Sequence, residues 1–287
     1  MMASYLAGVP IRLHTFTGLI FPHRTGVLKQ ILILMDKILC RLATHVYPEG
    51  RGVKSDLEKY KITKKNLKIL GNGNVNGINL EYFNHRLFSV DENNDFRLKL
   101  GLKANNVVFV FVGRLVKDKG IEELIDAFVD LSAKSYAKLL LVGPFEHELD
   151  KLADKTLEII HSHKSIISVG LQIDVRPYIS LSDILVFPSY REGFPNVPLQ
   201  CGAMKKALIL SNVTGCNEIV SHNKNGLLVP ARNKEELRVA MLELLDNVEL
   251  RNRFSEEILK SIQDRYEQSI VWNALKSEYD SLINQLP

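Results

Sequence analysis

Six short apolar segments recur between residues 107 and 230, and they constrain the fold more than any other feature of the sequence. They are VVFVFVG (107–113), KLLLVGP (138–144), IISVG (166–170), ILVFPS (184–189), ALILSN (207–212) and GLLVP (226–230). Each ends in Gly, Pro, Ser or Asn, and most contain β-branched residues. This pattern is typical of strands that are buried on both faces of a parallel sheet.

Segments with helical spacing separate these strands. They are GIEELIDAFVDLSAK (120–134), HELDKLADKTLEIIHSH (147–163), KEELRVAMLELLDN (234–247), a segment that runs to Tyr266, and SIVWNALKSEYDSLINQL (269–286). Strands that alternate with helices predict an α/β fold with a doubly wound sheet, which binds ligands beyond the carboxyl ends of its strands. In the last helix we expect one stripe, formed by Ile270, Trp272, Leu275, Tyr279 and Leu282, to pack on another domain.

The N-terminal part has a different pattern. ASYLAG (3–8) is typical of the end of a helix, VLKQILILMDKILCRLA (27–43) of a helix, and IRLHTF (11–16), THVYPEG (44–50) and LKILGNG (67–73) of strands. Three strands make half a Rossmann-like domain, and the first helix lacks an N-cap, so we expect an upstream segment. The expected domains are 1–88, an incomplete Rossmann-like domain; 89–264, a complete one; and 265–287, a helix that packs back toward the first domain.

Charge is distributed unevenly along the chain. Residues 1–88 hold 13 Lys and Arg against 5 Asp and Glu, whereas the remainder holds 24 against 28. This asymmetry indicates two domains that face different partners, the basic one an anionic membrane surface. The alternative is that residues 54–68 are a solvated helix and turn. Three scattered cysteines form no disulfide framework, and no apolar run approaches the roughly 18 residues of a membrane span. We therefore expect a cytoplasmic protein, peripheral at the inner membrane face, with no nucleic-acid partner.

Two cations flank the start of the helix at 120–134. Arg114, after Gly113, ends the first buried strand, and Lys119 precedes the helix. Free N–H groups and the helix dipole favour an anion at such an N-terminus, and two added cations suit a diphosphate. The alternative is that one cation pairs with Glu122 or Glu123 on the surface.

The stretch FPSYREGFPNVPLQCGAM (187–204) carries the second group of candidates. Glu192 follows a buried strand, and the amides of Gly193 and Phe194 lie beside it. A carboxylate here can accept hydrogen bonds from sugar hydroxyls or stabilise positive charge at an anomeric carbon; alternatively it pairs with Arg191. We expect Asn196 to be the N-cap of the next helix, with Gln200 on that helix.

Several spaced motifs carry a family resemblance from about residue 107 to the C-terminus. GRLVKDKG, LLLVGP, SDILVFPSYREGFPNVPLQCGAM, GCNEIV and NGLLVP together resemble the nucleotide-sugar half of retaining GT-B glycosyltransferases of family four. AGVPIRLHTFTG and NGINLEYF resemble the back half of that family's acceptor domain. LLLVGPFEHELD and NVPLQCGAM resemble the branch that builds bacterial capsular or O-antigen polysaccharide. The implied fold is GT-B: two Rossmann-like domains, here with the N-terminal one incomplete.

The resemblance implies roles for these residues. Gly113, Arg114, Lys119 and Asn196 would bind the donor, with Arg114 and Lys119 on its diphosphate. Glu192 matches the first glutamate of the family's Glu-x7-Glu pattern and would be catalytic, with Gly193 and Phe194 beside the donor sugar. The second, ribose-binding glutamate falls on Gln200, whose amide can hydrogen-bond but brings no charge.

Other family features are weaker or lacking in this sequence. Glu218 matches a further family glutamate, although capping its own helix accounts for it equally well. The family's first glycine-rich loop and its histidine-bearing strand have no counterpart, and His14 is a weak substitute for that histidine. No Asp-x-Asp motif occurs, so we expect neither a metal nor a cofactor.

The expected reaction is transfer of a sugar, with retention, from a UDP- or GDP-sugar to a saccharide or polyprenyl-diphosphate-linked saccharide, in surface polysaccharide synthesis. Two alternatives stay open. One is a non-catalytic nucleotide-binding remnant or subunit, and the other is a nucleotide-sugar epimerase of the same fold.

Overall fold

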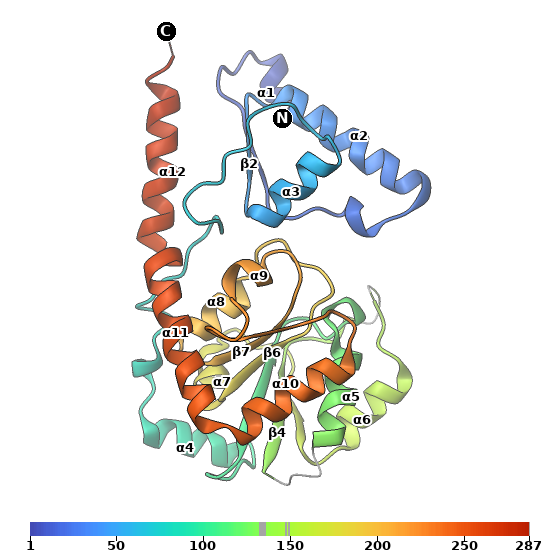
Figure 1. Cartoon of the computed structure of the whole chain (residues 1–287), viewed down its shortest axis with the longest axis vertical. Coiled ribbons are helices and arrows are strands. Elements are labelled where there is room, and N and C mark those ends of the chain that lie inside the picture. Colours follow the sequence, from blue (N-terminus) through green and yellow to red (C-terminus); the bar gives the residue numbers. More distant parts are fainter. Residues whose placement is uncertain (132–135, 147, 149, 287) are drawn as a thin grey trace. The chain divides into compact units, whose positions relative to one another are not determined.

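The structure is a computed structural model that describes residues 1–131, 136–146, 148 and 150–286, and the chain forms two compact units (Figure 1). Unit 1 consists of Met1–Gly77, Glu192–Phe194 and Arg265–Pro287, and unit 2 of Ile78–Arg191 and Pro195–Asp264. These units are groups of residues that pack together. The division into functional domains at 1–88, 89–264 and 265–287 stays a prediction.

Unit 2 is built on a six-stranded parallel sheet in the order β5-β4-β3-β6-β7-β8. Its strands are β3 (Val107–Val112), β4 (Ala137–Val142), β5 (Ile166–Ser168), β6 (Ile184–Phe187), β7 (Ala207–Ser211) and β8 (Leu227–Val229). The prediction of six buried parallel strands is therefore confirmed, and nearly every strand residue is buried. Aromatic rings of neighbouring strands add to this core, since Phe111 stacks on Phe187 with ring centroids 6.0 Å apart.

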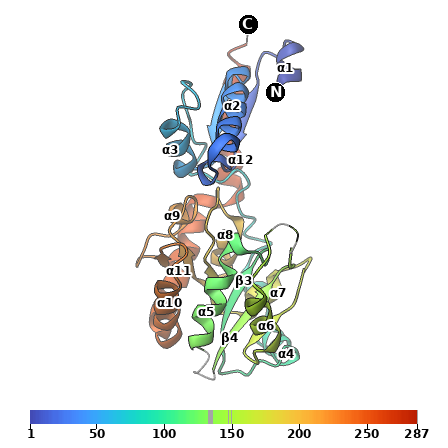
Figure 2. The same cartoon turned by 90° about the vertical axis from the view of Figure 1, so that its right-hand side faces the viewer.

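Helices separate the strands of unit 2 (Figure 2). They are η2 (His85–Leu87), α4 (Val90–Lys99), η3 (Lys117–Lys119), α5 (Ile121–Leu131), α6 (Asp154–Ser162), α7 (Arg176–Leu181), α8 (Asn196–Ala203), α9 (Cys216–Ile219), α10 (Lys234–Asp246) and α11 (Val248–Tyr266). Helix α5 packs against α6 and α10, and α8 packs against α9. None of the helices formed by the described residues is both long and apolar enough to cross a lipid bilayer.

One helix of unit 2 begins later than predicted. The sequence predicted a helix from residue 147, whereas α6 begins at Asp154; residues 147 and 149 lie outside the described residues. Residues 150–153 are held as a loop by hydrogen bonds to distant residues. The Asp150 carboxylate accepts from the backbone N–H of Asp118 at 2.7 Å, and Ala153 N–H donates to Glu122 at 2.9 Å. These tertiary bonds replace the helical ones that the local sequence favours.

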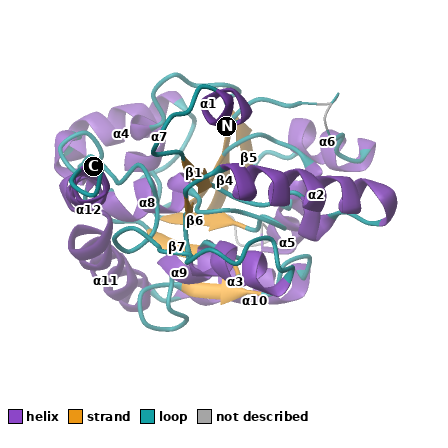
Figure 3. Cartoon of the chain, turned by 90° about the horizontal axis from the view of Figure 1, so that it is seen from above, coloured by secondary structure: helices purple, strands orange, loops and turns teal. Residues whose placement is uncertain are grey.

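Unit 1 contains a two-stranded parallel sheet, drawn with the other strands in orange in Figure 3. Its elements are α1 (Met2–Leu6), β1 (Leu13–Phe16), η1 (Phe21–His23), α2 (Gly26–Leu42), β2 (His45–Pro48), α3 (Arg51–Lys59) and α12 (Gln268–Ile283). The predicted third strand at 67–73 is wrong, because this segment forms only isolated bridges: Leu67 pairs with Val46, and Gly71 pairs with Gly73. Beyond it, left-handed backbone at Gly71, Gly73 and Asn74 turns the chain away from an extended path.

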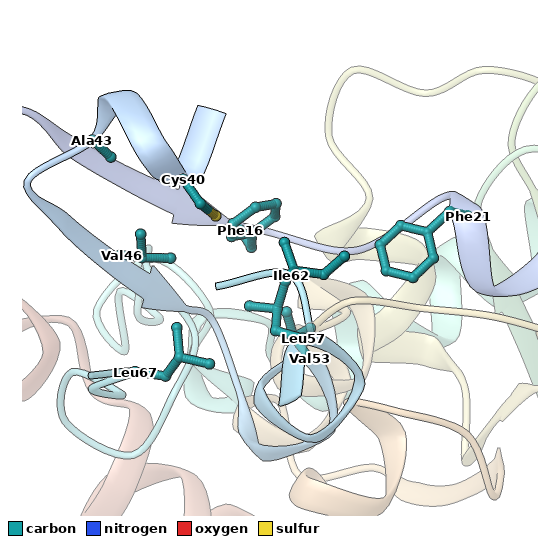
Figure 4. Close-up of a cluster of buried hydrophobic side chains, with 9 residues drawn as sticks. All are labelled: Phe16, Phe21, Cys40, Ala43, Val46, Val53, Leu57, Ile62 and Leu67. Atoms are coloured by element: carbon teal, nitrogen blue, oxygen red, sulfur yellow. The ribbon is translucent and has the colours of Figure 1, made fainter. Parts of the chain in front are cut away.

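The core of unit 1 lies between its sheet and helices α2 and α3 (Figure 4). It consists of nine buried residues: Phe16, Phe21, Cys40, Ala43, Val46, Val53, Leu57, Ile62 and Leu67. Helix α2 connects β1 to β2, so this core is that of one βαβ crossover.

The apolar stripe predicted for the last helix is wrong at two positions. Trp272 and Tyr279 are 55% and 45% exposed, whereas Val271 and Leu282 are buried. The buried face is rotated relative to the predicted one and includes a polar anchor. Glu278 accepts a hydrogen bond from the Tyr47 hydroxyl at 2.8 Å and pairs with the Lys68 amine. Contacts with polar partners in unit 1 therefore set which face of α12 is buried.

Candidate functional site

The strand order of unit 2 reverses between β3 and β6. Strands β4 and β5 extend the sheet on one side of β3, and β7 and β8 extend it on the other side of β6. In open α/β sheets, ligands bind at this switch point, outside the carboxyl ends of the strands. The residues that follow Val112 and Phe187 therefore form the candidate site, and two of the predicted groups lie there.

The chain after β3 carries Gly113 and Arg114. A Cβ at Gly143 would collide with the Gly113 carbonyl oxygen, so only glycine permits this close approach of the β3 and β4 ends. The Arg114 guanidinium is half-exposed and pairs with Glu146 at 3.0 Å. Arg114 thus pairs with Glu146, and Lys117 pairs with Glu122 at 3.5 Å.

Lys119 lies at the end of the η3 turn, before α5. Its amine lies 5.5 Å from the centroid of the Phe187 ring, at the carboxyl end of β6. Gly120 has left-handed backbone with φ of 71°, and a Cβ there would collide with the Pro188 carbonyl. The turn that carries Lys119 is therefore in direct contact with the end of β6.

Hydrogen bonds from Tyr190 and Arg191 tie this turn and the start of α5 to the loop after β6. The Tyr190 N–H donates to the Asp118 carbonyl at 2.9 Å, and the Arg191 guanidinium donates to the Asp118 carboxylate at 2.9 Å. The Tyr190 hydroxyl donates to Glu123 at 2.6 Å, and burial together with Glu123 raises the pKa of this hydroxyl. The Arg232 guanidinium lies 4.5 Å from the Tyr190 ring centroid. These contacts therefore connect the turn that carries Lys119 to the loop that precedes Glu192.

Sequence reasoning did not find this network. Asp118 stands between Lys117 and Lys119, and the sequence analysis considered only Arg114 and Lys119 as anion ligands in this segment. The signal for Asp118 was its place inside GRLVKDKG, but its partner Arg191 lies 73 positions away along the chain. No local pattern connects two residues at that separation.

The N-cap prediction for Asn196 is wrong. Asn196 is the first residue of α8, and the N-cap is Pro195, whose extended backbone precedes the helix and which makes no side-chain cap hydrogen bond. Gln200 lies one turn after Asn196, so the two side chains share a face of α8. Both amides can offer donors and acceptors to a ligand without adding charge.

The structure divides the predicted site residues between the two units. Gly113, Arg114, Lys119, Asn196 and Gln200 belong to unit 2, whereas Glu192, Gly193 and Phe194 are grouped with unit 1. In unit 1, the Phe194 ring is buried and lies 5.4 Å from the Tyr266 ring centroid. Phe194 therefore has a packing role that the sequence did not indicate.

His14 lies within β1. Its ring meets Phe16 edge-on with centroids 4.5 Å apart, and burial lowers its pKa. Within the described ranges, no three His, Cys, Asp or Glu side chains are grouped so that they could bind a metal ion. The charged groups described at the switch point include the cations Arg114 and Lys119 and the carboxylates of Asp118 and Glu146.

Comparisons with known proteins identify the family of this chain. The family model described as "Glycosyl transferases group 1" matches residues 92–261, more than half of the 287-residue chain. The capsular polysaccharide biosynthesis glycosyltransferase CapM of Staphylococcus aureus is 28% identical over 286 residues, which cover 99% of this chain and 74% of CapM. The N,N'-diacetylbacillosaminyl-diphospho-undecaprenol alpha-1,3-N-acetylgalactosaminyltransferase of Campylobacter jejuni is 26% identical over 210 residues, 73% of this chain and 54% of that enzyme. The chain thus spans between half and three quarters of the length of these two relatives.

Two solved structures share the fold. Anabaena HepE in complex with UDP superimposes with a TM-score of 0.81 at 19% identity, over 99% of this chain and 74% of HepE. Sucrose-phosphate synthase of Thermosynechococcus elongatus gives a TM-score of 0.80 at 22% identity, over 96% of this chain and 68% of that one. The predicted GT-B-like α/β fold is confirmed, and the family match shows that the chain belongs to the group 1 family of glycosyltransferases.

Proposed function

We propose that this chain transfers a sugar from a UDP- or GDP-sugar to a saccharide acceptor in surface polysaccharide synthesis, with retention at the anomeric carbon. The observation that carries the donor half of this proposal is the placement of Arg114 and Lys119. Both follow β3 on the way into α5, at the switch point of a sheet that belongs to a glycosyltransferase family. Retention rests on the sequence resemblance alone.

The local charges suit a diphosphate at this position. Glu122 and Glu123 lie in the first turn of α5 and would repel an anion if they were unpartnered. Instead, Glu123 accepts the Tyr190 hydroxyl, and Glu122 accepts the Ala153 N–H and pairs with Lys117. Arg114 is paired with Glu146, and exchange of one half-exposed carboxylate for a phosphate costs little.

In the proposed reaction, the nucleoside diphosphate leaves and negative charge develops on the oxygen of its β-phosphate. Arg114 and Lys119 stabilise this charge electrostatically. Glu192 stabilises positive charge at the anomeric carbon, with the amides of Gly193 and Phe194 beside the sugar. Gln200 hydrogen-bonds the ribose hydroxyls.

For the acceptor, we propose a polyprenyl-diphosphate-linked saccharide at the inner face of an anionic membrane. The names of two relatives support this choice: CapM is named for capsular polysaccharide biosynthesis, and the Campylobacter jejuni enzyme for an undecaprenol-diphosphate substrate. The basic N-terminal residues suit an anionic surface. We also propose that further strands, from an upstream segment, extend the two-stranded sheet of unit 1 into a full Rossmann-like domain.

Calorimetric titration with UDP and with GDP tests the donor site. We expect saturable binding of one nucleotide, weakened about tenfold or more in Arg114→Ala because a charge-assisted hydrogen bond is lost. Arg238→Ala is the matched control, since Arg238 pairs with Glu235 on α10, away from the switch point. A folded chain that binds neither nucleotide would overturn the proposal.

Two measurements separate the alternatives. Turnover by this chain alone, with donor and a lipid-linked acceptor, would exclude a non-catalytic remnant. Release of nucleotide with an isomerised sugar, in the absence of any acceptor, would instead indicate an epimerase.

A further inference from the structure

The loop after β4 brings a carboxylate to the proposed diphosphate site. Glu146 follows β4 in the chain, and its Oε2 lies 3.0 Å from Nη1 of Arg114, which follows β3. Strands β3 and β4 are parallel neighbours, so both residues lie beyond the carboxyl ends of adjacent strands. Arg114 is one of the two cations that the proposed function assigns to the donor diphosphate. This ion pair therefore joins an anion of the protein to a residue that would bind the anion of the ligand.

The backbone holds Glu146 beside Arg114. The Leu115 N–H donates to the Pro144 carbonyl at 2.8 Å, and Leu115 forms a parallel bridge with Phe145. These contacts continue the pairing of β3 and β4 past the ends of the two strands. Because Phe145 directly precedes Glu146 and Leu115 directly follows Arg114, the two charged residues stay neighbours in the backbone. Only rotation of their side chains can separate the charges.

The ion pair uses little of the hydrogen-bonding capacity of Arg114. A guanidinium has several N–H donors, and the bond to Glu146 is the single side-chain hydrogen bond that Arg114 forms with the described residues. The Arg114 side chain is 44% exposed, and that of Glu146 is 31% exposed. A phosphate that reaches Arg114 can therefore use the remaining donors while Glu146 stays in place.

A bound phosphate and Glu146 compete for one positive charge. The phosphate either shares the guanidinium with the carboxylate or takes its place. In the first case two anions are held close together and repel each other, and in the second case the carboxylate loses its partner. Both cases weaken the binding of the phosphate. Glu146 thus lowers the affinity of the site for an anion, although it also orients Arg114.

The other carboxylates of this loop have different surroundings. Asp150 accepts the Asp118 N–H at 2.7 Å and so holds the η3 turn. Glu148 is exposed. Among these three carboxylates, Glu146 is the one that contacts a proposed donor ligand. The two neighbours therefore separate the effect of a charge at this one position from the effect of the loop's total charge.

The competition should act more strongly on the product than on the donor. In a nucleotide sugar, the terminal phosphate is esterified to the sugar. After transfer, that phosphate gains an ionisable oxygen, which loses its proton with a pKa of about 6 and so adds negative charge at neutral pH. A fixed carboxylate next to the diphosphate site repels the more highly charged species more strongly.

We propose that Glu146 is a built-in competitor for Arg114 that favours release of the nucleoside diphosphate product over loss of the nucleotide-sugar donor. It sets the affinity of the donor site without contacting the sugar. The inference rests on the proposed function, because it requires a diphosphate at Arg114.

Calorimetric titration of Glu146→Gln tests this role with UDP, GDP, UDP-glucose and GDP-mannose. Glutamine keeps an oxygen that can accept from Arg114 and removes only the charge. We expect the variant to bind its nucleoside diphosphate roughly three- to tenfold more tightly than the unsubstituted chain, and the matching nucleotide sugar at most about twofold more tightly. Dissociation of the nucleoside diphosphate, followed by stopped flow, should slow in proportion.

Glu148→Gln is the matched control, because it makes the same change of charge in the same loop. It should alter either affinity by less than about twofold. Glu146→Ala removes the hydrogen bond together with the charge, and it should still bind the nucleoside diphosphate at least as tightly as the unsubstituted chain. Thermal melts confirm that each variant is folded.

Several results would overturn the inference. If Glu146→Gln leaves the affinity unchanged, or if Glu146→Ala weakens it, the carboxylate only orients Arg114. Equal tightening of nucleoside diphosphate and nucleotide sugar, or an equal effect of Glu148→Gln, would exclude a selective action on the product. Nucleotide binding that Arg114→Ala abolishes and Glu146→Gln does not change would uphold the donor site and remove this inference alone. A folded chain that binds no nucleotide would remove both proposals.

Discussion

Both units contain parallel strands connected through helices, but they differ in how much apolar side-chain surface they leave exposed. Unit 2 buries its apolar strands under helices and carries charged side chains, among them Arg114 and Glu146, at the carboxyl edge of its sheet. Unit 1 has a sheet of two strands and a connecting helix with six exposed apolar side chains. A closed core leaves polar groups free to bind a small charged ligand, whereas an open apolar face requires a partner. The difference places the proposed donor site in the unit with the closed core.

The largest effect is expected from substitutions that remove one core side chain from each unit. Phe111→Ala should cost unit 2 about 3–5 kcal/mol, and Leu57→Ala should cost unit 1 about 2–5 kcal/mol, because both side chains are fully buried. Scanning calorimetry should show each substitution lowering its own transition. Trp272 fluorescence, which reports on unit 1, should follow Leu57→Ala alone. If both substitutions shift one common transition equally, the units unfold as one and the comparison fails.

A medium effect is expected from the loss of the hydrogen bond between Tyr190, in the loop after β6, and Glu123 of α5. Tyr190→Phe removes the hydroxyl that Glu123 accepts, which should destabilise unit 2 by about 1–2 kcal/mol and weaken nucleotide binding a few-fold. The exposed Tyr82 of the same unit provides the control substitution, Tyr82→Phe. Equal effects of the two substitutions in denaturant unfolding would show that the network does not position the site.

The smallest effect concerns Asp36 on the inner side of α2. Burial raises the pKa of this carboxyl, so the folded state holds its proton more tightly than the unfolded chain does. Ionisation therefore destabilises unit 1 at neutral pH, and this cost disappears as the pH falls through the raised pKa toward the ordinary value. Asp36→Asn should raise the melting midpoint slightly at pH 7, with a smaller gain near pH 4.

Thermal melts followed by Trp272 fluorescence measure this gain. The control is Glu58→Gln, at an exposed carboxylate of α3 in the same unit. A gain that is the same at both pH values, or a loss at pH 7, would contradict the assignment of Asp36 to the buried side of the helix.

Much of unit 2 could be predicted from the sequence. Its six strands coincide with six apolar runs, because strands buried on both faces need no long-range information to be recognised. The same strand ends locate Gly113, Arg114 and Lys119 at the ligand edge. Their roles in binding, like those of Glu192 and Gln200, stay predictions.

The errors have two physical causes. Residues 150–153 look helical but bond to the η3 turn, the stripe of α12 is rotated by Tyr47 and Lys68, and residues 71–74 turn instead of extending. In each case a distant partner or a left-handed backbone outweighs a local preference. Helical and strand propensities are small beside such contacts.

The sequence by itself determined the order of strands and helices and the position of the cations, because the periodicity of apolar residues is local. Only the tertiary structure decided that Asp118 meets Arg191, and that the outer face of α2 is exposed. An apolar helix has the same sequence pattern whether its second face is covered or not. Which face meets protein and which is left for a partner depends on residues far away in the chain.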